Sequence, residues 1–121
     1  MTTVRRDGSP RISGTEVVLD EGAPVRLHDA GARRAADVQR DPRLALHSHS
    51  ADPPPDDPAG WPGEAKVTVR AVADDRRTGP EVDCSRVDVT EAVMTRLGEP
   101  PDRLVIEAWH ADRGITQLAR R

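Results

Sequence analysis

The sequence contains no phenylalanine and no tyrosine, and its only aromatic residues besides histidine are Trp61 and Trp109. A hydrophobic core must therefore be built from Val, Leu, Ala and Ile. Because β-branched side chains pack well on the pleated surface of a sheet, such a core favours strands. Hydrophobic residues make up 36% of the 121 residues and charged residues 32%, which predicts one domain, spanning residues 1–121, with a small core.

Cysteine occurs once, as Cys84, which excludes an internal disulfide and a cysteine-rich zinc site. No apolar run is long enough to span a membrane, and no signal peptide is visible, so we expect a cytoplasmic protein. The 18 Lys and Arg residues are outnumbered by 21 Asp and Glu residues, which gives a net charge of −3. This balance argues against a general nucleic-acid binder, which would carry a basic field.

Alternating apolar and polar residues predict a series of short strands, over residues 2–6, 11–20, 23–28, 43–50, 64–75, 86–97, 103–110 and 115–119. Asp7-Gly8 predicts a two-residue hairpin turn between the first two, because glycine adopts positive φ without strain. Residues 30–40 are rich in Ala and Arg and predict a helix that Pro42 ends. Residues 52–63 hold five prolines and predict a loop. Several short strands with one helix favour a mainly β protein, a β-barrel.

A basic pair, Arg33-Arg34, falls in the first turn of the predicted helix. Cations at this end oppose the helix dipole, which costs a few tenths of a kcal/mol. A bound anion would reverse the sign, because the free N–H groups and two guanidinium groups together suit a phosphate. The alternative is that this pair forms a solvated basic face.

Two further patterns are candidate sites. Arg11, Ser13 and Thr15 share one face of the second strand, and Gly14 between them indicates a bulge or a close backbone approach. The alternative there is a bulge with exposed hydroxyl groups. His47 and His49 share a strand face and could bind a metal, but they would need a third ligand, such as Asp52, His28 or His110.

These segments, taken in order, resemble a known family. The hairpin T-V-R-x-D-G-S-P-R from Thr3, the basic helix, A-L-H-S at 45–48, and I-E-A-W-H at 106–110 with its following glycine turn and basic tail are similar to the pyridoxamine 5′-phosphate oxidase-like flavoproteins, in particular actinobacterial-type members. The match runs from Thr3 to Arg121. The resemblance implies a split β-barrel that binds FMN, or the deazaflavin coenzyme F-420, and pairs as a homodimer.

The resemblance also implies roles for individual residues. Arg33 and Arg34 would hold the cofactor phosphate, although Ala32 stands where relatives often have a small hydroxyl residue. Arg11, Ser13 and Thr15 would line the ring or the ribityl chain, and His47 would flank the site. Trp109 would stack on the cofactor or fill a dimer interface, or else pack at the end of the barrel.

The function implied is that of an oxidoreductase that transfers a hydride to a small substrate, with the cofactor supplying the chemistry. The alternatives are a non-catalytic or degenerate cofactor-binding module and an unrelated β-barrel interaction domain. Two segments depart from the family. Relatives usually carry a helix before the first strand, so we expect either a truncated reading frame or a dimer that covers the exposed face. The segment 74–85 is shorter than the one that relatives usually carry there.

Overall fold

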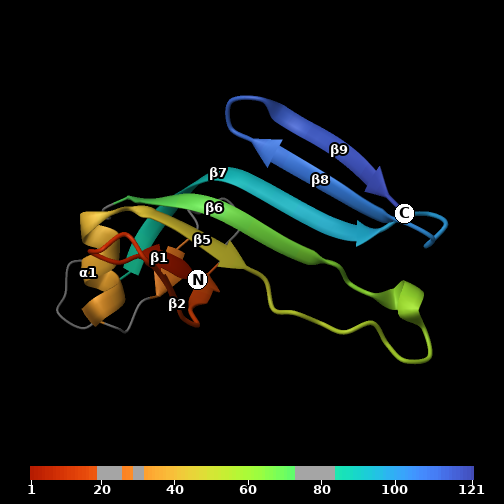
Figure 1. Ribbon diagram of the computed structural model, residues 1–121, viewed down its shortest axis with the longest axis horizontal. Helices are drawn as coiled ribbons and strands as arrows, with labels where there is room; N and C mark the ends of the chain where they lie inside the picture. Colours follow the sequence, from red (N-terminus) through yellow and green to blue (C-terminus); the bar gives the residue numbers. More distant parts are fainter. Residues whose placement is uncertain (19–25, 29–31, 73–83) are drawn as a thin grey trace. The chain divides into compact units, whose positions relative to one another are not determined.

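A computed structural model describes residues 1–18, 26–28, 32–72 and 84–121 of the chain. These residues form a mainly β structure with one α-helix (Figure 1). Its elements are β1 (Thr2–Val4), β2 (Pro10–Ile12), β3 (Glu16–Val18), β4 (Arg26–His28), α1 (Ala32–Arg40), β5 (Arg43–His47), the short 3-10 helix η1 (Pro58–Gly60), β6 (Glu64–Val72), β7 (Cys84–Leu97), β8 (Leu104–His110) and β9 (Gly114–Arg120).

The described strands pair in the order β2-β1-β5-β6-β7-β4-β3, and β8 adds to β7 and carries β9. The pairings with a defined register are antiparallel: β1 with β2 and β5, β4 with β3 and β7, and β8 with β7 and β9. No pairing among the described strands joins the ends of this series, so the sheet is open there. Because the described residues form nine strands and one α-helix, the prediction of a mainly β fold is confirmed.

The chain divides into two compact units. Unit 1 comprises Met1–Leu46 with Thr68–Val89, and unit 2 comprises His47–Val67 with Thr90–Arg121. Strands β6 and β7 each contribute residues to both units.

Unit 1 is built on alternating apolar residues. In β5, Leu44 and Leu46 are buried, whereas the intervening Ala45 and the flanking Arg43 are exposed, as the period of a strand requires. Val69 of β6 and Val87 of β7 are also buried. The helix α1 packs against β1 (Figure 1). The core is thus made of small aliphatic side chains, as the absence of Phe and Tyr predicts.

Unit 2 contains the hairpin of β8 and β9, which lies beside the last part of β7 (Figure 1). Its buried apolar residue is Val105, which leaves Leu104 and Trp109 of the same strand 39% and 36% exposed. Every residue of β9 is exposed, because β9 pairs only with β8 among the described strands.

Two local predictions are wrong. The strand expected over 11–20 is interrupted after Ile12, and a separate strand begins at Glu16, so Ser13 and Thr15 lie in the connection. The Asp-Gly turn is not a two-residue turn. Arg5 N–H donates to Ser9 O (2.8 Å) and Gly8 N–H donates to Arg5 O (3.0 Å), so Arg6, Asp7 and Gly8 form the loop. Gly8 has φ +85°, the conformation that closes such three-residue turns.

The remaining predicted elements agree with the described ones to within a few residues. Five predicted segments extend outside the described residues: the strand over 11–20 after residue 18, the strand over 23–28 up to residue 25, the helix over 30–40 before Ala32, the strand over 64–75 after residue 72, and the segment 74–85 up to residue 83. The helices in the described part of the chain are too short and too polar to cross a membrane.

Candidate functional site

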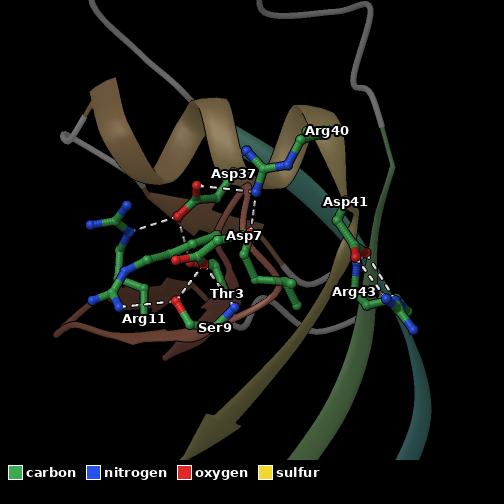
Figure 2. A network of polar contacts seen from close by, with 10 residues as sticks. Thr3, Asp7, Ser9, Arg11, Asp37, Arg40, Asp41 and Arg43 are labelled. Carbon is green, nitrogen blue, oxygen red and sulfur yellow. Dashed lines mark hydrogen bonds and ion pairs between the residues drawn. The ribbon is translucent and has the colours of Figure 1, made fainter.

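The first residues to consider lie around a buried carboxylate on α1. Asp37 is only 4% exposed, and three side chains donate to it (Figure 2). Arg11 Nε lies 2.6 Å from Oδ2, Thr3 Oγ1 lies 3.2 Å from the same oxygen, and Arg40 Nη2 lies 3.3 Å from Oδ1. The hydrogen bond from Arg11 is the main reason why the pKa of Asp37 is lowered. This cluster fixes β1, β2 and α1 to one another.

Two other carboxylates of unit 1 accept hydrogen bonds from a residue two positions further along the chain. Asp7 Oδ1 accepts from Ser9 N–H (2.9 Å) and Ser9 Oγ (2.6 Å), which lowers the pKa of Asp7. Asp41, just after α1, accepts from Nε (2.9 Å) and Nη2 (2.7 Å) of Arg43 and from its backbone N–H (3.1 Å). These bonds lower the pKa of Asp41 to about 2. Such local pairs are structural, since each is satisfied by a neighbour in sequence.

The predicted phosphate-binding pair lies where the sequence placed it. Arg33 and Arg34 are in the first turn of α1, and that turn contains no acidic residue. Arg33 is exposed, and Arg34 is partly buried with Nη1 donating to the carbonyl oxygen of Gly14. The pKa of the Met1 amino group is lowered by burial and then by the charge of Arg34. Positive charge therefore collects between the start of α1 and the end of β2.

The segment after β2 brings a hydroxyl group to this region. Ser13 pairs with Met1 through its backbone, with N–H to O at 2.9 Å and the Met1 amino group to Ser13 O at 2.8 Å. Its side-chain Oγ is buried and has no hydrogen-bond partner among the residues that the structure describes. A buried hydroxyl without a partner is unfavourable, so such a group often marks a place where a ligand or a water completes the site. Thr15, two residues further, is partly buried.

Arg11 stands apart from the other predicted residues of this segment. Its Nε is engaged by Asp37, and the side chain is 24% exposed. Any contact of Arg11 with a cofactor would therefore use its terminal nitrogens. The pair with Asp37 also removes Arg11 as a source of unbalanced positive charge.

His47, at the end of β5, belongs to unit 2. Its Nδ1 lies 2.8 Å from the carbonyl oxygen of Ser48, and its Nε2 lies 3.6 Å from Glu64 Oε2. Within the described part of the chain, no three His, Cys, Asp or Glu side chains are grouped so that they could hold a metal ion.

Trp109 lies on β8, directly opposite Ala92 of β7 and Ile115 of β9. Paired residues of an antiparallel sheet share a face, so these three side chains lie in a row. With Met94 they help to line a hollow of about 310 Å³ in unit 2. The indole therefore has room beside it for a further apolar group.

A second cavity of unit 2 contains residues that sequence reasoning did not single out as a site. It measures about 700 Å³ and is bordered by Trp61, Asp52 and Glu64, among others. Asp37 was missed as well. The signal that could have found Asp37 is its position as the one acidic residue of a basic helix, within reach of several arginines.

Comparison with known proteins gives no relative for this chain: no family model, no curated protein and no solved structure matches it.

Proposed function

We propose that this protein binds FMN, or the deazaflavin coenzyme F-420, through the cofactor phosphate at the first turn of α1. The observations that carry the proposal are the basic pair in the first turn of α1, the contact of Arg34 with the carbonyl of Gly14, and the neighbouring Ser13 hydroxyl, which has no hydrogen-bond partner among the described residues. A phosphate there would meet charge-assisted donors and the positive end of the helix dipole, and would offset the unfavourable interaction of the two cations with that dipole.

The residues present are compatible with such a group. Arg34 is already oriented by the carbonyl of Gly14, and an exposed Arg33 beside it can close on an anion. Ser13 and Thr15 would face the ribityl chain or the ring, and Arg11 would contribute a terminal nitrogen. A bound flavin or deazaflavin would supply hydride transfer to a small substrate, and the chain would bind and orient the cofactor.

We further propose that the chain is a cytoplasmic oxidoreductase of the pyridoxamine 5′-phosphate oxidase-like family, a split barrel that pairs as a homodimer. The mainly β fold with a helix directly before β5 supports this proposal. The second candidate is a non-catalytic or degenerate cofactor-binding module, which is favoured by the absence of an acidic residue from the first turn of α1. An unrelated β-barrel interaction domain is the third.

Visible absorbance after gel filtration tests the proposal. We expect the protein to retain FMN or coenzyme F-420 in stoichiometric amount. The double variant Arg33→Ala/Arg34→Ala should bind the cofactor about 100-fold more weakly, because two charge-assisted hydrogen bonds are lost. The matched control is Arg5→Ala/Arg6→Ala, which removes the same charge from an adjacent exposed pair at the other end of the β1-β2 hairpin.

The outcomes separate the candidates. A retained cofactor that NAD(P)H does not reduce favours the non-catalytic module. A folded protein that retains neither cofactor overturns the proposal and favours the interaction domain. Equal losses of affinity in both double variants would show that only net charge matters, and would remove Arg33 and Arg34 as the seat.

A further inference from the structure

The larger cavity of unit 2 is unrelated to the proposed phosphate site. It lies beside the segment between β5 and β6, and its volume of about 700 Å³ is in the range of small-molecule sites. All of its described lining residues belong to unit 2: Ser50, Ala51, Asp52, Pro53, Pro58, Ala59, Trp61, Glu64, Leu97, Pro101 and Leu104.

The wall of this cavity is held in place by specific contacts. Ser48 and Ala65 close the neck of the loop, with Ser48 N–H to Ala65 O at 2.7 Å and Ala65 N–H to Ser48 Oγ at 3.0 Å. The Trp61 indole N–H donates to Ala51 O at 2.8 Å and so fixes the ring across the loop. Gly63 is buried with φ +81°, and a Cβ there would collide with the carbonyl oxygen of Thr95. The loop is therefore anchored near its two ends, through Ser48 with Ala65 and through Ala51 with Trp61.

Five prolines further restrict the loop, because each fixes one backbone dihedral. A wall that is already ordered loses little conformational entropy when a ligand binds. This property distinguishes the cavity from a gap between mobile surface side chains.

The lining has a consistent chemistry. Trp61, Leu97, Leu104 and the prolines provide apolar and aromatic surface. The ionisable side chains on it are Asp52 and Glu64, and among the described residues no Lys, Arg or His lines it. Glu64 is 37% exposed, and its Oε2 lies 3.6 Å from Nε2 of His47, which is not part of the lining. The cavity therefore combines two carboxylates with an indole, and no described cation on its lining balances them.

We propose that this cavity binds a small organic cation, an amine or quaternary ammonium compound with an apolar body. The carboxylates of Asp52 and Glu64 attract the ammonium group, and the indole of Trp61 adds a cation–π interaction. The apolar body packs on Leu97, Leu104 and the prolines. Anionic ligands are disfavoured by the same carboxylates, so the cavity and the phosphate site select opposite charges.

Fluorescence of Trp61 tests the selection of charge. The variant Trp109→Phe leaves Trp61 as the only tryptophan. It is titrated with phenethylamine, with the neutral phenethyl alcohol and with the anionic phenylpropionate. We expect phenethylamine to change the emission and to bind at least about tenfold more tightly than the alcohol, with phenylpropionate weakest. Equal affinity for amine and alcohol, or no binding of the amine at millimolar concentration, overturns the proposal.

Substitutions then assign the binding to the cavity. Glu64→Gln and Asp52→Asn should each weaken phenethylamine binding about fivefold or more, because each removes a charge and keeps the shape of the side chain. The control is Asp56→Asn, which removes the same charge from an exposed position of the same loop that does not line the cavity. Far-UV circular dichroism and thermal unfolding establish that each variant is folded.

Two results of this series would overturn the assignment. If Asp56→Asn weakens binding as much as Glu64→Gln, the effect is one of general surface charge. If none of the three substitutions alters affinity, the amine binds elsewhere. The proposal is independent of flavin binding, since Arg33→Ala/Arg34→Ala should leave the affinity for phenethylamine unchanged.

Discussion

At the scale of the residue, the described unit 1 depends on one buried carboxylate. Asp37 receives hydrogen bonds from Arg11, Arg40 and Thr3, and each donor comes from a different element (Figure 2). Removal of the charge would leave Arg11 partly buried beside a weaker acceptor, and an unpaired buried charge is unfavourable. Asp37 therefore acts as an anchor for the hairpin on the helix.

The same contacts predict a pH dependence. Since the folded pKa of Asp37 lies below its ordinary value of 3.8, the ionised form stabilises the fold above that value. This stabilisation is lost as the pH falls through the lowered folded pKa. We expect Asp37→Asn to lower the free energy of unfolding at pH 7 and to flatten its decline below pH about 4. Urea unfolding at a series of pH values measures both effects.

The control for this experiment is Asp56→Asn, which replaces an exposed carboxylate outside the network. It should leave the free energy of unfolding at pH 7 close to that of the original chain. If the free energy of unfolding of Asp37→Asn declined at low pH as steeply as that of the original chain, the role given to Asp37 would be contradicted.

At the scale of the element, alternation along the sequence predicted β5, β6, β7, β8 and β9 well. In β5, for example, the alternate residues Leu44 and Leu46 are the buried ones. The helix was predictable because Ala and Arg favour it and Pro42 ends it. These signals lie within each segment, so the elements can be predicted without knowing which strands pair.

The features that sequence reasoning missed depend on contacts between distant residues. The break between β2 and β3 is one, because the backbone of Ser13 pairs with Met1 while Arg34 takes the carbonyl of Gly14. The cavity beside Trp61 is another, since its lining joins a proline-rich loop to Leu97 and Leu104. The alternation of apolar and polar residues within a segment predicts neither which strands pair nor which residues close the loop. The predicted seat at Arg33 and Arg34, by contrast, depends only on where α1 begins.

The loop before β6 gives a prediction at this scale. Gly63→Ala should lower the free energy of unfolding by about 1–3 kcal/mol, because alanine is strained at positive φ and its Cβ would meet the Thr95 carbonyl. It should also weaken phenethylamine binding, since the wall of the cavity must shift. Gly14→Ala is the matched control, because a Cβ at Gly14 meets nothing within 4 Å. Similar losses in both variants would contradict the close contact at Gly63.

At the scale of the whole molecule, β9 has an edge that no described strand covers. Among the described strands it pairs only with β8, and Ile115 and Leu118 are 75% and 51% exposed. These two residues are an odd number of positions apart, so they lie on opposite faces of the sheet. A strand with an open edge and apolar side chains on both faces is a ready site for pairing with another strand.

We expect a second copy of this chain to pair with that edge. Antiparallel pairing of two β9 strands about Gln117 would use the whole strand, Gly114–Arg120. The arrangement is two-fold symmetric and closed, which is the commonest form of a homodimer. It is also the association that the proposed family membership implies.

Sedimentation velocity should therefore show a dimer. The substitutions Ile115→Lys and Leu118→Lys should each weaken the dimer at least about tenfold. Each places a charge where apolar surface becomes buried. Ala36→Lys, at an exposed position of α1, adds the same charge away from β9 and should leave the dimer intact. A monomeric original chain, or a dimer that tolerates both β9 substitutions, would contradict pairing through this edge.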